Sequence, residues 1–309
     1  MSAPFASGSA YPTGAGFPAP PPGSDGWPWT PTKAQTPLAH DGNWPRMTVV
    51  TPSYNQAYYL ERTIRSVLLQ GYPNLEYIVI DGGSTDDSAE IIRKYERWIS
   101  FWVSERDNGQ AGAINRGLKL ATGDWLAWQN SDDIFYPGAF AAIAMRSLKK
   151  PHADLIIGNI NLIDENDRVL SDLRYVRPTF KALLAEGMVL TNQAAFWRRS
   201  VHDRIGWLKE DMVCAFDYEW FLRVLEQRRA DHTDRVLGAF RIHRHAKTTM
   251  IADRCREERE QVVRGRQLPA WQVRLLQARR IALMLAGGHF FYLARALVRR
   301  ALGIRKEVV

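Results

Sequence analysis

The feature that most constrains the fold is an alternation of short apolar runs with helix-like stretches between residues 47 and 129. Four runs have the length and composition of β-strands: MTVVT, LEYIVID, ISFWVSE and DWLAWQ. Between them, apolar residues recur at helical spacing up to breakers such as Gly-Tyr-Pro and Thr-Gly. Because parallel strands need crossover connections, which are usually helices, this pattern predicts a parallel sheet covered by helices.

Polar clusters follow all four of these runs. They occupy residues 52–55, 81–86, 106–110 and 130–133. In open parallel sheets, ligands bind outside the carboxyl ends of the strands, so we expect the four loops to converge on one edge. After residue 137 the alternation gives way to strands and helices with longer loops, which predicts a mixed-sheet second half of an α/β protein.

The two ends of the chain differ in composition from its middle. Residues 1–46 contain 10 of the 16 prolines and almost no aliphatic side chains, which predicts a disordered leader. Its tryptophans 27, 29 and 44 fit either a partly collapsed linker or a docking segment. We expect residues 47–250 to form the folded body and residues 251–309 a basic helical tail. The leader lacks the features of a secretory signal, so a cytoplasmic protein is expected.

The net charge of +8 resides in the tail. Residues 250–309 carry 13 Lys and Arg against 5 Asp and Glu, so the rest of the chain is neutral. A neutral body argues against nucleic acid as a partner. Residues 281–293 are too short an apolar run to span a bilayer. A basic amphipathic helix at 270–309 on an anionic membrane surface and a helix packed on the body both remain open.

Neither of the two cysteines, Cys214 and Cys255, stands in a CxxC or Cys/His ligand pattern. The sequence therefore supports neither a disulfide framework nor a structural zinc site, and a reducing compartment is expected.

Two of the polar clusters have residue types suited to a nucleotide. Asp132 and Asp133 could hold Mg²⁺ or Mn²⁺ beside a diphosphate, or could cap the helix expected after residue 137. The turn from Asp81 through Gly83 suits a carboxylate that accepts from a base N–H or a ribose hydroxyl. Neither GxGxxG nor GxxxxGK[ST] is present, which argues against a dinucleotide fold and a P-loop.

Four ordered blocks resemble the inverting glycosyltransferases of family 2, which have the glycosyltransferase-A fold. The blocks are TPSYNQAYYLERTIRSVLLQGYPNLEYIVIDGGSTDDS, DNGQAGAINRGLKLATGDWLAWQNSDD, FDYEWFLRV and FRIH, within residues 47–250. The resemblance implies a Rossmann-like nucleotide-binding half continuous with a mixed-sheet acceptor half. It also implies sugar transfer from a UDP- or dTDP-linked donor to a glycan or lipid-linked acceptor, in polysaccharide or cell-envelope glycan synthesis.

Position by position, the resemblance implies three sets of site residues. Asp217 would be the catalytic base, and Asp132, in the D-x-D position, would ligate Mg²⁺ or Mn²⁺ with His243 nearby. The residues alone favour an N-cap role for Asp217 over a catalytic one, and they leave His243 open as a core histidine. The nucleotide site would comprise Thr51, Pro52, Tyr54, Asn55, Asp81, Gly83, Gln110, Asn115 and Ser131.

Two positions depart from the family pattern. Asn130 stands where the family usually has Asp, and Gly112 stands where close relatives often carry Asp. These departures leave an alternative open, a non-catalytic nucleotide-sugar-binding or scaffold protein of the same fold. The intact Asp132, Asp217 and His243 argue against it, because a decayed site loses its base or metal ligand first.

Overall fold

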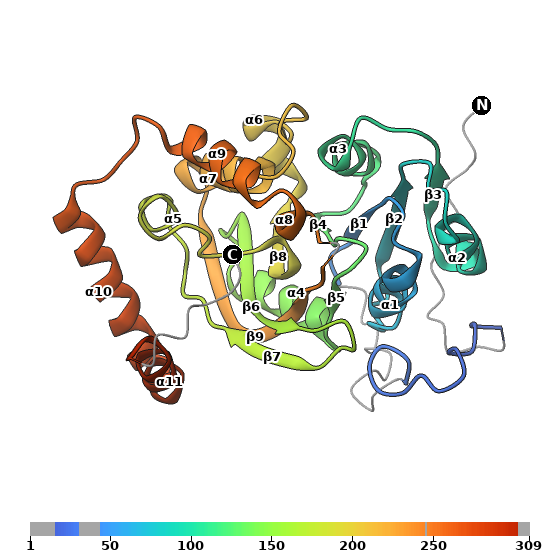
Figure 1. Cartoon of the computed structure of the whole chain (residues 1–309), viewed down its shortest axis with the longest axis horizontal. Coiled ribbons are helices and arrows are strands. Elements are labelled where there is room, and N and C mark those ends of the chain that lie inside the picture. The colour runs from blue at the N-terminus through green and yellow to red at the C-terminus, as the bar shows by residue number, and fades with distance from the viewer. Residues whose placement is uncertain (1–15, 31–43, 245, 302–309) are drawn as a thin grey trace.

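The computed structural model describes residues 16–30, 44–244 and 246–301. Within them, nine strands form one sheet in the order β3-β2-β1-β4-β8-β6-β9-β5, with β7 paired to β6 (Figure 1). The strands are β1 (Met47–Ser53), β2 (Leu75–Asp81), β3 (Phe101–Ser104), β4 (Trp125–Trp128), β5 (Ile134–Phe135), β6 (Leu155–Ile163), β7 (Val169–Leu173), β8 (Ala195–Arg198) and β9 (Ala230–Arg241).

The helices lie around this sheet (Figure 1). They are α1 (Ala57–Leu68), α2 (Ser88–Lys94), α3 (Gln110–Leu120), α4 (Ala139–Lys149), α5 (Phe180–Glu186), α6 (His202–Ile205), α7 (Phe216–Gln227), α8 (Lys247–Met250), α9 (Ala252–Val263), α10 (Ala270–Ala286) and α11 (Phe290–Ala301). The parts of the expected leader and tail at residues 1–15, 31–43 and 302–309 lie outside the described residues.

The first half of the sheet is parallel, as predicted. β1 pairs in parallel with both β2 and β4, and β2 pairs in parallel with β3. Every residue of β1 and β2 is buried, as expected for strands that helices cover on both faces. The carboxyl ends of these strands therefore face one edge, where the polar loops follow.

The second half of the sheet is mixed and continuous with the first. β8 is antiparallel to both β4 and β6, β9 is parallel to β6, and β5 is antiparallel to β9. Three buried indole rings join the halves, with Trp197 centred 5.2 Å from Trp128 and 4.9 Å from Trp220 of α7. Burying such a side chain stabilises a fold by roughly 1.5–3 kcal/mol, so the start of α7 is held firmly against β4 and β8.

Residues 16–30 pack on α1, although the composition predicted disorder there. The buried Arg65 side chain donates to the carbonyl oxygens of Pro18 (2.8 Å), Pro28 (3.2 Å) and Trp29 (3.0 Å). A proline-rich segment cannot satisfy its own carbonyl groups in regular structure, and a guanidinium with five donors does this for it. Aromatic contacts add to this arginine, because Trp29 is buried, Phe17 packs on Tyr95 and Trp98, and the Trp27 indole donates to the Phe135 carbonyl oxygen.

The C-terminal helices also contact the body. α9 packs on α7, and α10 packs on α5, where Arg280 forms an ion pair with Glu186 at 2.5 Å. None of the helices within the described ranges is long and apolar enough to cross a bilayer.

The two cysteines form a disulfide, so the prediction from their spacing is wrong. Cys214 lies in the loop before α7 and Cys255 lies on α9, with 5.1 Å between their Cα atoms. The residues are 41 positions apart and meet only because α9 folds back over α7. No local spacing rule could reveal this pairing.

Candidate functional site

The acidic turn after β4 separates its two aspartates into different environments. Asp133 is buried and accepts hydrogen bonds from the Asn130 side chain (3.0 Å), the Gln193 side chain (2.7 Å) and the Arg241 backbone N–H (2.8 Å). Burial, and then the neighbouring Asp132 carboxylate, raise the pKa of Asp133 above its usual range. Asp133 therefore fixes the turn. Neither residue caps α4, which begins only at Ala139.

Asp132 remains accessible and meets His243. Its side chain is 20% exposed, and its Oδ2 lies 3.0 Å from Nε2 of the buried His243. The imidazole ring packs against Tyr59, with ring centroids 4.6 Å apart. Its Nδ1 is buried without a hydrogen-bond partner among the described residues. The structure thus brings together the two predicted metal ligands.

The donor set fits a divalent cation only with help from a ligand. No group of three or more His, Cys, Asp or Glu side chains in the described residues could hold a metal ion. Asn130 is not a free ligand, because its side chain bonds to Gln110 and Asp133. A magnesium ion typically uses one or two protein carboxylates together with substrate phosphates. Asp132 and His243 match such a partial protein shell.

Arg241 is a site residue that the sequence reasoning missed. The buried guanidinium donates to the carbonyl oxygens of Asp132 (2.7 Å) and Asp164 (2.8 Å) and to the Asp167 carboxylate (2.6 Å). It also lies over the Tyr59 ring, 5.0 Å from the centroid. Side chains alternate between the two faces of an extended chain, so residues 241 and 243 share one face. The assignment of His243 could therefore have pointed to Arg241.

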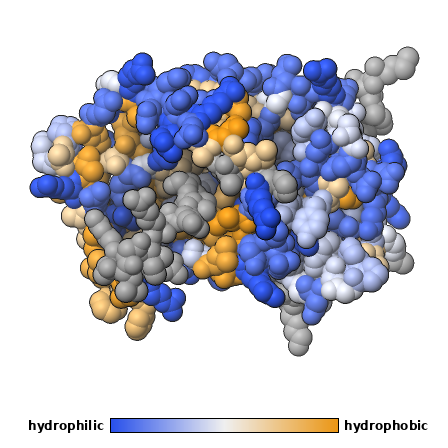
Figure 2. Space-filling model, viewed as in Figure 1, coloured by the Kyte–Doolittle hydropathy of each residue, from blue (hydrophilic) through white to orange (hydrophobic). Residues whose placement is uncertain are grey.

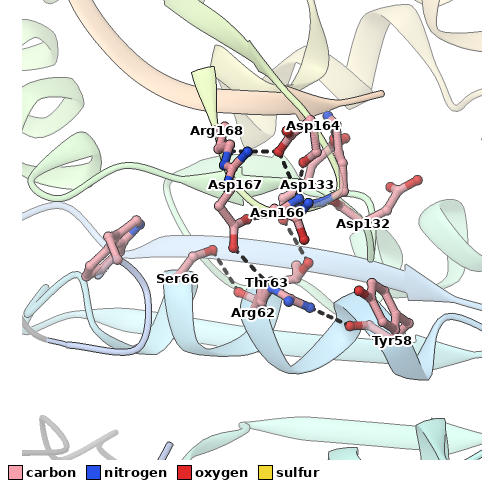
Figure 3. Close-up of polar contacts among 12 residues, drawn as sticks. Tyr58, Arg62, Thr63, Ser66, Asp132, Asp133, Asp164, Asn166, Asp167 and Arg168 are labelled. Carbon is pink, nitrogen blue, oxygen red and sulfur yellow. Dashed lines mark hydrogen bonds and ion pairs between the residues drawn. The ribbon is translucent and has the colours of Figure 1, made fainter. Parts of the chain in front are cut away.

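The turn between β6 and β7 contacts α1 beside the acidic turn. Arg62 of α1 bonds to the Asp167 carboxylate at 3.1 Å, and Thr63 lies 2.7 Å from the carbonyl oxygen of Asp133. Figure 3 shows both α1 side chains pointing towards the β6–β7 turn and the acidic turn. Asp167 thereby links α1 to Arg241 of β9.

The loops after β1 and β2 are tied to each other. The buried Asp81 carboxylate accepts from the Ser84 N–H (2.9 Å), the Ser84 hydroxyl (2.5 Å) and the Ser104 hydroxyl (2.6 Å). Ser84 in turn accepts from the Asn55 N–H at 2.8 Å, and Asn55 accepts from Thr85 N–H. The predicted convergence of the first two loops is therefore present.

Glycine at position 83 is required by the backbone there. Gly83 has φ of +77°, and a Cβ atom would lie 3.0 Å from the backbone nitrogen of Arg106. Both the left-handed conformation and the close approach exclude other residues. Tyr54 is exposed beside this turn, and Pro52 is buried at the end of β1.

Two predicted nucleotide residues have their polar groups occupied within the fold. The Thr51 hydroxyl accepts from the Tyr77 hydroxyl inside the sheet at 3.0 Å. The Asn115 side chain donates to the Leu208 carbonyl (2.9 Å) and the Glu210 carboxylate (2.8 Å) and accepts from the Leu208 N–H. These residues support the loops that carry the site.

The position of Glu210, which bonds to Asn115, also explains the glycine at position 112. A Cβ atom at this position would lie 3.6 Å from a carboxylate oxygen of Glu210. An aspartate there would place two carboxylates side by side, which costs free energy unless a cation separates them. The glycine at position 112 avoids this repulsion with Glu210.

Gln110 connects the third loop to the acidic turn and to α8. Its amide donates to the Asn130 side chain (3.0 Å) and accepts from the Lys247 ammonium group (3.1 Å). The pKa of Lys247 is lowered, mainly by burial. Ser131 is buried in the acidic turn, and its carbonyl oxygen lies 2.9 Å from the Thr63 hydroxyl. The third and fourth loops thus also meet, and Lys247 is a second residue that the sequence reasoning missed.

Asp217 is the second residue of α7 and is half-buried. The helix begins at Phe216 with Ala215 as its N-cap, so the N-cap interpretation of Asp217 is wrong. Burial raises its pKa to about 6, against the effects of backbone hydrogen bonds and of the charges on Arg259 and Lys247. A carboxylate of this pKa accepts a proton near neutral pH more readily than an ordinary aspartate does.

Comparisons with known proteins identify the family of the chain. Residues 48–206, more than half of the chain, match the model of Glycosyl transferase family 2. An uncharacterized glycosyltransferase of Mycobacterium tuberculosis is 34% identical over 182 residues, which cover 58% of this chain and 68% of that protein. Glycosyltransferase GlyG of Streptococcus pneumoniae is 33% identical over 124 residues, 39% of this chain and 41% of GlyG.

Solved structures share the fold. The S. aureus TarS 1–349 complex with UDP-GlcNAc has a TM-score of 0.59 at 16% identity, over 78% of this chain and 73% of that one. Mannosyltransferase PcManGT from Pyrobaculum calidifontis, in complex with GDP-Man and Mn²⁺, has a TM-score of 0.56 at 19% identity, over 85% and 81% of the two chains. The sheet order, the loops at its carboxyl edge and the family match lead to one conclusion. The chain belongs to glycosyl transferase family 2 and is a glycosyltransferase with the glycosyltransferase-A fold.

Proposed function

We propose that the chain transfers a sugar, with inversion, from a UDP- or dTDP-linked donor to a hydroxyl group of a glycan or lipid-linked acceptor, in polysaccharide or cell-envelope glycan synthesis. The observation that carries the proposal is the contact between Asp132 and His243 at the edge where the polar loops converge. The TarS complexes with UDP-GlcNAc and UDP support a uridine nucleotide as the first donor to test.

The nucleotide would lie on the loops after β1, β2 and β3. Pro52, Tyr54, Asn55, Gly83 and Ser131 stand at this edge, and Asp81, whose buried carboxylate accepts from Ser84 and Ser104, would accept from a base N–H. Thr51 and Asn115 would act through the loops they hold, and Gln110 through the acidic turn.

Asp132 and His243 would hold Mg²⁺ or Mn²⁺ together with the diphosphate of the donor. The cation, when bound, neutralises charge on the departing nucleoside diphosphate. The Mn²⁺ complex of PcManGT supports the choice of metal.

Asp217 would act as the general base. Its carboxylate takes the proton of the acceptor hydroxyl while that oxygen forms a bond to the anomeric carbon. The bond from this carbon to the donor phosphate oxygen breaks in the same step, and the nucleoside diphosphate leaves with the electron pair. A single displacement of this kind inverts the configuration.

The test is nucleoside diphosphate release from a panel of nucleotide sugars, with water in place of the acceptor. Wild-type protein should release the nucleotide from one donor, and Asp217→Asn should lose this activity while it binds the nucleotide with unchanged affinity. Asp211→Asn, at a nearby exposed position, is the control. Release by Asp217→Asn at the wild-type rate would contradict the role of the base.

We also propose that residues 270–309 dock on an anionic membrane surface, at the inner face of the cell membrane. α10 and α11 expose large apolar side chains, among them Trp271 (64% exposed) and Phe291 (77% exposed). Figure 2 shows apolar side chains interspersed with hydrophilic ones over these helices. The basic surplus of the tail complements the anionic lipids of a cytoplasmic leaflet.

A further inference from the structure

A carboxylate on α9 caps the loop that leads into α7. Glu258 accepts hydrogen bonds from three consecutive backbone N–H groups, those of Val213 (3.0 Å), Cys214 (2.8 Å) and Ala215 (3.0 Å). Burial raises the pKa of Glu258, and the hydrogen bonds from these N–H groups lower it. The hydrogen bonds have the larger combined effect, so the pKa lies below its ordinary value. The groups stand just before the first turn of α7, where backbone donors lack helical partners.

Two further residues of α9 contact the same segment on either side of Asp217. Cys255, one turn before Glu258, is bonded to Cys214. Arg259, next to Glu258, lies over the ring of Tyr218 at 5.2 Å, and its positive charge acts on Asp217. Asp217 therefore lies between two points that α9 fixes.

We propose that α9 is a positioning element for the catalytic base, in which Glu258 fixes the backbone from which Asp217 reaches the acceptor. The disulfide reinforces this contact. The inference rests on the proposed role of Asp217. It extends the catalytic unit beyond residue 250, to the end of α9, which lies outside the residues that match the family model.

The donor site is built from other elements. Asp81 ends β2, and Asp132 and His243 follow β4 and β9, whereas the hydrogen bonds of Glu258 among the described residues go to residues 213–215 and Arg254. Its charge also acts on Lys247, which lies on α8 and not in the acidic turn. A change at Glu258 should therefore lower kcat and leave nucleotide binding intact. A residue with a general stabilising role would lower both together or neither.

The experiment compares Glu258→Ala and Glu258→Gln with Glu257→Gln, an exposed neighbour on the same helix. In the full chain, with the nucleotide sugar that wild-type protein hydrolyses fastest, Glu258→Ala should lower kcat by roughly 10- to 100-fold, the scale of a small misplacement of a catalytic group. Glu258→Gln, whose amide oxygen still accepts, should retain more activity. Nucleotide affinity and the Glu257→Gln rate should stay at wild-type values.

A double-mutant cycle separates this inference from the role of the base itself. If Glu258 acts through Asp217, adding Glu258→Ala to Asp217→Asn should cause no further loss of rate. A wild-type rate for Asp217→Asn would overturn the base assignment. A low rate for Asp217→Asn with a wild-type rate for Glu258→Ala would overturn only the positioning role.

Hydrogen exchange gives a readout that needs no turnover. The amides of residues 213–215 should exchange faster in Glu258→Ala, which removes their acceptor, than in wild-type protein, while those of β1 should not change. Cys255→Ser serves as a second variant, with a lowered kcat and unchanged nucleotide affinity expected. Unchanged exchange at residues 213–215 would overturn the proposal.

Discussion

His243 Nε2 lies 3.0 Å from Oδ2 of Asp132, although the two residues are 111 positions apart. The contact forms because β9 runs in parallel beside β6 and delivers its end to the turn after β4. One buried imidazole and one accessible carboxylate thus meet at the carboxyl edge of the sheet, where the polar loops converge.

Removing the Asp132 carboxylate should weaken metal-dependent nucleotide binding. Asp132→Ala is expected to lower UDP affinity in Mn²⁺ by at least about tenfold, because a ligand of the cation is lost. Its affinity in EDTA should equal that of wild-type protein in EDTA. Asp203→Ala, at an exposed position on α6 outside the loops assigned to the nucleotide, is the control for isothermal titration calorimetry. Equal affinities for Asp132→Ala and wild type in Mn²⁺ would exclude the metal role.

The rate of nucleoside diphosphate release should depend on the ionisation of Asp217. Burial raises its pKa to about 6, and a general base works only when deprotonated. The profile of kcat/KM against pH should therefore fall below about pH 6 and level off above it. An acid limb near pH 4, the range of an ordinary aspartate, would show that Asp217 is not the titrating base.

Arg241 should be essential for stability. Arg241→Ala would leave the Asp167 carboxylate and two carbonyl groups without their partner, which is expected to cost about 3 kcal/mol or more of unfolding free energy. Urea denaturation measures this, with Arg168→Ala, an exposed arginine of the β6–β7 turn, as control. A loss below about 1 kcal/mol, as at an exposed ion pair, would contradict the contacts of Arg241.

Membrane docking should depend on the apolar face of α11. Replacing Phe290 and Phe291 with Asp should abolish sedimentation with phosphatidylglycerol vesicles and leave UDP binding unchanged. Leu148→Asp, on exposed surface of α4, is the control. Wild-type protein should bind phosphatidylcholine vesicles weakly, because charge attraction is then absent. No binding of wild-type protein to either vesicle would refute the membrane partner.

The parallel half of the sheet could be predicted because its signals are local. The run LEYIVID and the breaker after α1 fix a strand and a helix end without reference to the rest of the chain. Pairings across long separations carry no such signal. The β6–β9 ladder, the disulfide and the bonds of Glu258 each join segments that only the complete fold brings together.

Only part of the candidate site could be predicted, because many of its contacts also join segments far apart in the sequence. The resemblance identified Asp132 and His243, which the structure brings together. It did not reveal that the polar groups of Thr51 and Asn115 are hydrogen-bonded within the fold, to Tyr77 and to the 208–210 loop. Buried arginines such as Arg65 and Arg241 were missed because hydropathy patterns assign charged side chains to the surface.

The most direct test of a nucleotide-sugar transferase is calorimetric binding of UDP, dTDP, GDP and CMP to the full chain, first with Mn²⁺ and then with EDTA. We expect either UDP or dTDP to bind in Mn²⁺ and to lose affinity in EDTA, with no binding of CMP. Absence of binding by every nucleotide in Mn²⁺ would contradict the donor site and favour a non-catalytic scaffold protein of the same fold.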